Sequence, residues 1–361
     1  MYNIGMKRLI ISSLLLLVNL ALYFLFRNDA GSFFPAYRNM TRQWLKVLSS
    51  VTGLVRFSLW DIILLILFVL FIYSVIRIIG KKDKLKNLLL NAYMIGSVIL
   101  TMTVSCWMLN HYSPELSEEI NLYIRQYSQD ELYQTTEYYL LKASEHSVLI
   151  ERDARNHIIE YDFDEMADIA GRSYGSLEDE YPVFSGSSAR VKKLTLTGDY
   201  LLYNDISGIF IPVTAESCVP GNIPDADMPF TMAHEAAHRL CLAGEDEANF
   251  AAFMACISND DVRFRYSGYY NAFSYCFSSL YRQDKDSALQ LYKKYENEGV
   301  ALLKLDRRDT SEAYRKYDSP LSEISDRIND TYLKTFGEEE GIRSYGLVTD
   351  YLIAWYLKNN C

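Results

Sequence analysis

Three apolar stretches in the first 109 residues constrain this chain more than any other feature of its sequence. They cover about residues 9–26, 60–79 and 88–109. The first and third carry no charge, and from Ile62 onward the second carries only Arg77 near its end. Because a helix needs about 20 mostly apolar residues to cross a bilayer, we predict three transmembrane helices in a multi-pass protein of the cell membrane.

The first stretch could instead be a cleaved signal peptide. It is long for a signal peptide, and the residues after it, Phe26-Arg-Asn-Asp29, offer no small-x-small cleavage site. We therefore interpret it as an uncleaved anchor.

Basic residues predict the orientation, because Lys and Arg are retained on the cytoplasmic side. Lys7 and Arg8 precede the first stretch, and Arg77 with four lysines between residues 81 and 86 follows the second. Five basic residues spread over residues 27–58 argue for the opposite orientation, although apolar side chains there indicate an interfacial segment. We expect a cytoplasmic N-terminus and an extracytoplasmic chain after Leu109.

The remaining residues are numerous enough for a globular domain with its own core. The chain has only 8 prolines and 17 glycines, which favours long helices over strands. Three short β-prone runs, Val191–Thr197, Tyr200–Tyr203 and Gly208–Val213, predict a small antiparallel sheet. The expected fold is mainly α with a small antiparallel β-sheet, divided into a membrane domain at 1–109 and a globular domain at 110–361.

Charge and cysteine content exclude several classes of protein. Residues 1–109 hold twelve Lys and Arg against three Asp, which leaves 24 of the 36 basic and 43 of the 46 acidic residues for the rest. A domain with this excess of acidic residues would repel the phosphate backbone of a nucleic acid, and we therefore expect no nucleic-acid partner. The six cysteines form no CxxC pair, which indicates buried thiols, with a bridge such as Cys218 to Cys241 as the alternative.

The segment Pro229-Phe-Thr-Met-Ala-His-Glu-Ala-Ala-His-Arg-Leu-Cys-Leu-Ala-Gly244 carries the chemistry. His234 and His238 are four residues apart, which on a helix places both imidazoles within reach of one zinc ion. In this HExxH pattern Glu235 would take a proton from water that attacks a metal-polarised carbonyl, and would deliver it to the leaving amine. The alternative is a pair of hydrogen-bonded core histidines.

A catalytic zinc needs three protein ligands and one open position. No histidine follows His238, whereas Glu245 and Glu247 open a second, almost wholly apolar helix. We predict that one of these two carboxylates is the third ligand. Acids at a helix N-terminus are also ordinary partners of the helix dipole, which is the alternative interpretation.

A peptidase also needs a donor for the oxyanion and a surface that holds the peptide. With no histidine downstream, the candidate donors are Arg265, Tyr266, Tyr269, Tyr270 and Tyr345. The β-prone run 208–213 could be the edge against which an extended peptide pairs.

HExxH followed by a helix that begins Glu-x-x-Ala-Asn resembles the gluzincin peptidases, which include membrane-bound members. The pattern matches in this chain at His234–His238, with Glu245 or Glu247 as the acid that opens the second helix. The resemblance implies a zincin-like globular domain, Glu245 as the third zinc ligand and Asn249 as the residue that orients a histidine. From the spacing alone, both Glu245 and Glu247 remain candidates.

A closer similarity, over most of the chain, is to the bacterial family of three-span membrane proteins called domain of unknown function 3810. It rests on the three spans, on the HExxH segment, and on the segments Gly208–Glu216, Glu245–Phe250 and Glu340–Gly346. The similarity supports the fold and the zinc site, favours Tyr345 as the donor, and supplies no substrate. Cys241 stands where a glycine is expected.

The sequence therefore predicts a membrane-anchored zinc peptidase that acts on a peptide or protein substrate. One alternative is a non-catalytic sensor or scaffold in which zinc is a structural clamp, although such a protein has no need of Glu235. Another is a cytoplasm-facing regulatory protease, as the ImmA/IrrE group of gluzincins suggests.

Overall fold

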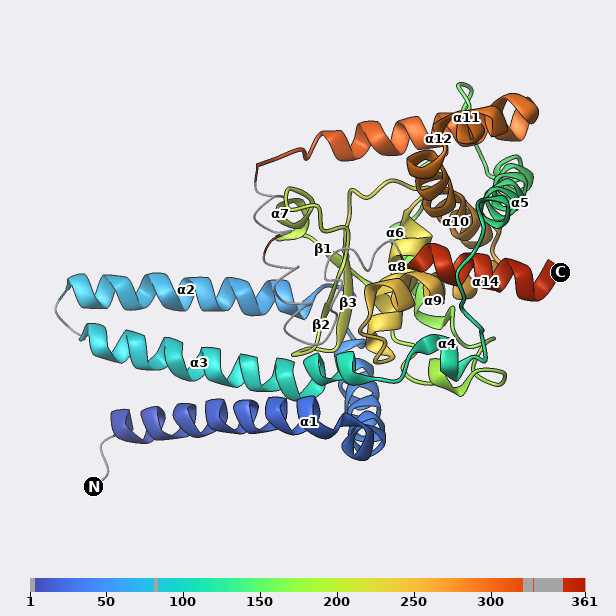
Figure 1. Ribbon diagram of the computed structural model, residues 1–361. Helices are drawn as coiled ribbons and strands as arrows, with labels where there is room; N and C mark the ends of the chain where they lie inside the picture. The colour runs from blue at the N-terminus through green and yellow to red at the C-terminus, as the bar shows by residue number, and fades with distance from the viewer. Residues whose placement is uncertain (1–3, 81–83, 321–326, 328–346, 361) are drawn as a thin grey trace.

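The computed structural model describes residues 4–80, 84–320, 327 and 347–360, and it shows a membrane part joined at one end to a mainly helical globular part (Figure 1). The membrane part contains α1 (Ile4–Thr52), α2 (Leu59–Ile79) and α3 (Leu85–Cys106), followed by the 3-10 helix η1 (Met108–Tyr112). The globular helices are α4 (Leu116–Glu119), α5 (Gln129–Ser147), α6 (Phe163–Arg172), η2 (Pro182–Phe184), α7 (Gly198–Leu202), α8 (Met228–Arg239), α9 (Glu245–Ile257), α10 (Val262–Gln283), α11 (Lys285–Lys294), α12 (Glu298–Arg315) and α14 (Val348–Asn360).

Three helices are long and apolar enough to cross a membrane, as the sequence predicts. The 21 residues of α2 span about 31 Å at 1.5 Å per residue, close to the thickness of a hydrocarbon core. The beginning of α1, the end of α2 and the beginning of α3 lie at one end of this part, and the globular part lies at the other end (Figure 1).

The second half of α1 differs from the first half in direction and in the faces it exposes. Asp29 departs from helical geometry (φ −153°, ψ 62°), and beyond it the helix turns across the axis of its first half (Figure 1). One face is buried at helical spacing, by Phe34, Tyr37, Thr41 and Leu45. A neighbouring face exposes the large apolar residues Met40, Trp44, Val47 and Val51. This two-sided pattern is typical of a helix that lies in the surface of a bilayer.

The three membrane helices are not packed equally. Hydrogen bonds join α1 to α3, from Asn19 to Thr101 (3.1 Å) and from Arg8 to Asn91 (2.7 Å). By contrast, Asp61 in the first turn is the only buried residue of α2. Beyond its first turn, α2 therefore stands largely apart from its neighbours.

The start of α2 is fixed to the globular part by two buried carboxylates. Asp61 accepts hydrogen bonds from the backbone N–H groups of Thr195 (2.8 Å) and Leu196 (2.9 Å). Glu216 accepts from the backbone N–H groups of Leu59 (3.0 Å) and Trp60 (3.1 Å), and it pairs with the buried Lys192. The Glu216 contacts satisfy donors at the N-terminus of α2, and the two carboxylates together set the position of this helix.

The sheet is mixed, so the predicted antiparallel sheet is wrong. Strands β1 (Lys192–Leu194), β2 (Ile209–Ile211) and β3 (Glu216–Pro220) have the order β1-β3-β2, and β1 pairs parallel to β3 whereas β2 pairs antiparallel to it. Most of the predicted strand at Tyr200–Tyr203 instead belongs to α7. The side chain of Tyr200 is 63% exposed, so it covers no face of the sheet. Strand β3 shows no alternation, since all of its residues are buried.

The described cysteines are free, as predicted for buried thiols, and the alternative bridge between Cys218 and Cys241 is not formed. Cys218 lies in β3 near Ser58, whereas Cys241 packs with Leu45 of α1. Cys361 lies outside the described residues.

Candidate functional site

His234, Glu235 and His238 lie on α8, a helix that is buried in the core. Pro229 lies in its first turn, where a missing N–H costs nothing. Alanines at 233, 236 and 237 are almost fully buried, and they let α8 pack closely against α9 and β3. The rings of His234 and His238 face the same side, with centroids 4.6 Å apart.

The end of α8 fixes the second histidine. Cys241 has a φ of 71°, and the bonds from Cys241 N to His238 O (3.0 Å) and from Leu242 N to Ala237 O (3.3 Å) form a Schellman cap. This left-handed position favours glycine, which accounts for the glycine expected there. The turn brings the Leu242 carbonyl to 2.7 Å from His238 Nδ1. If Nδ1 carries the proton, Nε2 is free to bind a metal.

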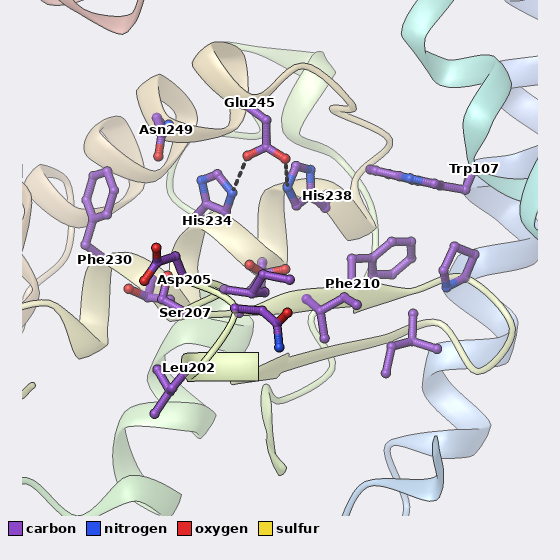
Figure 2. A pocket seen from close by; sticks show the side chains of 18 of the residues that line it. Trp107, Leu202, Asp205, Ser207, Phe210, Phe230, His234, His238, Glu245 and Asn249 are labelled. Atoms are coloured by element: carbon purple, nitrogen blue, oxygen red, sulfur yellow. Dashed lines mark ion pairs between the residues drawn. The ribbon is translucent and has the colours of Figure 1, made fainter. Parts of the chain in front are cut away.

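Helix α9 begins directly after Gly244 and places Glu245 against both imidazoles (Figure 2). One carboxylate oxygen lies 3.2 Å from His234 Nε2 and the other lies 3.8 Å from His238 Nε2. One ligand atom from each of the three residues lies within 4.8 Å of the others. The structure thus brings together His234, His238 and Glu245.

Glu247 points elsewhere. Its carboxylate accepts a hydrogen bond from the backbone N–H of Leu116 (2.6 Å), at the start of α4. Of the two carboxylates that the sequence left open, only Glu245 therefore faces the histidines.

The pKa values of Glu245 and His238 suit a cation, whereas that of His234 reflects its contact with the Glu245 carboxylate. Burial would raise the pKa of Glu245, but the hydrogen bond and charges of the two histidines lower it to about 2. Burial lowers the pKa of His238 to about 4, which keeps this ring neutral at pH 7. Burial also opposes charge on His234, but its contact with Glu245 raises that pKa. An ionised carboxylate beside a neutral imidazole is the form in which these groups bind metals.

Glu235 lies next to this cluster without belonging to it. Burial raises its pKa to about 8, and Oε2 has no hydrogen-bond partner among the described residues. The close neighbour of its side chain is Gly208, where an added Cβ would lie 2.4 Å from Glu235 Oε1. A buried carboxyl group with a raised pKa and a free oxygen is suited to hold and return a proton.

Asn249 lies one turn after Glu245 on α9, on the side of His234 (Figure 2). Its Oδ1 accepts a hydrogen bond from the hydroxyl of Tyr275 (3.1 Å) in α10. Nδ1 of His234 is buried and has no partner among the described residues. Asn249 is thus close to His234, the histidine that the resemblance assigns to it, and its side chain helps to raise the pKa of His234.

These residues line a cavity of about 920 Å³. Its walls come from β2 and the segments beside it, from α8 and α9, from Asn271 and Tyr275 of α10, and from Tyr314 of α12. The membrane part also contributes, through Trp60 of α2 and Ile99 and Thr103 of α3. The membrane helices therefore form part of the wall of the site.

Of the predicted oxyanion donors, the four that the structure describes do not line this cavity. Tyr266 bonds to Asp306, Arg265 donates to the Asn259 and Asp260 carbonyls, and neither Tyr269 nor Tyr270 lines the walls. Tyr345 lies outside the described residues. Sequence reasoning missed Tyr275 and Tyr314, although the four-residue spacing of Asn271 and Tyr275 places both on one face of α10.

The donor set fits a zinc ion. Two imidazole nitrogens and one carboxylate oxygen are the ligands of several catalytic zinc sites. Ligands of a tetrahedral zinc lie roughly 3.4 Å apart. One ligand atom from each of the three residues lies within 4.8 Å of the others, and the two Glu245 oxygens lie 3.2 Å from His234 Nε2 and 3.8 Å from His238 Nε2. His234, His238 and Glu245 would hold the ion, and the cavity leaves its fourth side open.

Comparison with known proteins identifies one family. The family model described as "Protein of unknown function (DUF3810)" matches residues 37–353, which include α2, α3 and every element that lines the cavity. No curated protein and no solved structure matches the chain.

Proposed function

Because this chain belongs to the DUF3810 family, whose function is unknown, we propose its function from its own site: a membrane-anchored, zinc-dependent peptidase of gluzincin type. The observation that carries the proposal is the convergence of His234, His238 and Glu245 on one point, with the unpaired carboxylate of Glu235 beside it. A structural clamp would need the first three residues but not the fourth.

Each residue has a distinct task in the proposed reaction. A zinc ion supplies Lewis-acid polarisation of a carbonyl and a lowered pKa of water. Glu235 accepts a proton from the attacking water and returns it to the leaving amine. The Leu242 carbonyl holds the ring of His238 in place. The hydroxyls of Tyr275 and Tyr314 lie on the cavity wall, where Tyr275 donates to Asn249 and Tyr314 is hydrogen-bonded to Asp227. Either hydroxyl would hold the developing oxyanion by turning away from its present partner.

The same cavity offers a place for an extended peptide. Strand β2 is an edge of the sheet, since the strand order is β1-β3-β2, and it lies along the cavity wall. Its outer backbone N–H and C=O groups are suited to pair with a substrate in the manner of an added strand. Such pairing uses hydrogen bonds to the backbone of the substrate and not to its side chains. It therefore supports a peptide substrate without defining the sequence of that peptide.

The proposal is tested with the purified full-length protein in nanodiscs. Incubation with a mixture of synthetic peptides, followed by mass spectrometry, is expected to show cleavage that a zinc chelator abolishes and added zinc restores. Bound zinc without cleavage of any peptide would instead support the scaffold interpretation.

Gly208 provides a test that leaves every proposed ligand intact. Gly208→Ala places a methyl group against Glu235 Oε1 and is expected to displace this carboxylate. Misplacement of a reacting group by about 1 Å can cost about 10²-fold in rate, so we expect a loss of this order with zinc content unchanged. Gly31→Ala is the control, because nothing lies within 4 Å of a Cβ added there. Undiminished cleavage by Gly208→Ala would contradict the placement of the base.

We also propose that the globular part lies outside the cytoplasm. The basic residues Lys84 and Lys86 lie at the start of α3, at the end of the membrane part opposite to the site. Protease added to intact spheroplasts is expected to digest residues 110–361. Protection until lysis would favour the cytoplasm-facing alternative.

A further inference from the structure

The candidate site lies at the level where the membrane helices end. Trp107 directly follows α3, and its ring contacts His238 edge-on, with centroids 5.2 Å apart. The same ring lies 5.0 Å from that of Phe210 in β2. Trp is enriched at membrane–water interfaces, and the exposed apolar face of α1 marks the same level. The proposed metal ligands therefore lie close to the bilayer surface.

The cavity continues from this level into the membrane part. Ile99 and Thr103 line it from α3, and Trp60 lines it from the start of α2. Ile99 is seven residues before the end of α3 at Cys106, which places it about 10 Å deeper along the helix. The cavity thus reaches into the depth at which acyl chains would lie.

Polarity changes along the cavity. Trp107 and Phe210 lie at the side of the membrane helices, and Asp205 and Ser207 lie at the opposite side, with His234, His238 and Glu245 between them (Figure 2). Phe230 and Leu202 lie beside the polar pair, so the far end of the cavity is mixed, whereas the end at the membrane helices is mostly apolar. A ligand that fills this cavity therefore has an apolar end toward the membrane.

The helix arrangement leaves a route into the apolar end. Only the start of α2 is held, by Asp61 and Glu216, and the rest of α2 stands apart while α1 and α3 pack together. In a bilayer, the faces of α2 and α3 that flank the cavity must be covered by lipid or by another apolar helix.

From these observations we propose that the substrate is a membrane-anchored polypeptide, cleaved within a few residues of its membrane-spanning helix while that helix lies between α2 and α3. The inference rests on the proposed peptidase function. The segment that leaves the bilayer would pass Trp107, pair with the edge of β2 and reach Glu235. A soluble peptide would leave the apolar end of the cavity unfilled.

The experiment compares three synthetic substrates with the full-length protein in nanodiscs. One is an unstructured 30-residue segment fused to a helix of leucine and alanine, the second has a 20-residue Gly-Ser spacer between the two, and the third is the segment alone. The spacer keeps the substrate in the same bilayer but moves the segment about 25 Å from the helix. Mass spectrometry gives the rate and the cleaved bond for each.

We expect the direct fusion to be cleaved within about six residues of the helix, and at least about tenfold faster than the spacer variant or the segment alone. Ile99→Trp places a larger side chain in the part of the cavity that α3 lines. We expect it to reduce the rate advantage of the direct fusion over the other two substrates. Leu100→Trp is the matched control, since Leu100 is exposed and does not line the cavity.

The outcomes separate this inference from the proposed function. Equal cleavage of all three substrates would overturn the inference and leave the peptidase intact. Cleavage of the fusion only far from its helix would also overturn it. If the zinc-loaded protein cleaves none of the three substrates, both proposals fail. In that case, release of fatty acids from the nanodisc lipids would show that the apolar end of the cavity binds a lipid.

Discussion

Replacing Glu235 by Gln is expected to abolish most peptide cleavage while zinc remains bound. The change is nearly isosteric and leaves His234, His238 and Glu245 untouched, but it removes the group that accepts the proton. Loss of a general base typically costs about 10² to 10⁴ in rate. The measurement is the rate of peptide cleavage by the purified protein, with metal content determined on the same sample.

Glu247→Gln is the matched control, because it neutralises a buried glutamate on the neighbouring helix whose carboxylate accepts from Leu116. Cleavage by this variant should stay within a few-fold of the unaltered protein. If Glu235→Gln retains both full activity and full zinc occupancy, Glu235 is not the base and the proposed mechanism must be abandoned. The scaffold interpretation predicts a silent change at Glu235.

Replacing Glu245 by Ala is expected to lower zinc affinity by more than about 100-fold. Groups that merely orient zinc ligands contribute about 10- to 100-fold, so loss of a ligand should exceed this range. Zinc affinity is measured by competition with a chelating dye.

Glu247→Ala should keep its zinc and lose stability instead. It leaves the buried N–H of Leu116 without this acceptor, at a cost of about 1–3 kcal/mol in the free energy of unfolding. Thermal unfolding of the zinc-loaded variants measures this loss of unfolding free energy. The reverse pattern, with zinc lost in Glu247→Ala and kept in Glu245→Ala, would show that the carboxylates exchange roles.

The sheet shows where sequence patterns fail. Strand β3 was not predicted, because a strand buried on both faces lacks the alternation that marks a half-exposed strand. Tyr200–Tyr203 has strand-like residues, but five residues from Gly198 form α7, since Tyr200 has no sheet face to cover. Pairing partners depend on segments distant in the chain, which local patterns do not contain.

The three apolar helices and the helix that carries HExxH could be derived from sequence alone. Hydrophobicity over about 20 contiguous residues decides the first feature, and four-residue spacing on a helix decides the second. Both are local properties, since neither depends on what the rest of the chain does.

Only the tertiary structure decided which groups meet the two histidines. Glu245 and Glu247 are two residues apart, so on a helix their side chains point about 160° apart, and the packing of α9 against α8 turns Glu245 toward the cluster. In the same way, the docking of α3 places Trp107 against His238, across 131 residues of chain. Such contacts are set by the packing of whole helices, and no spacing along the sequence records them.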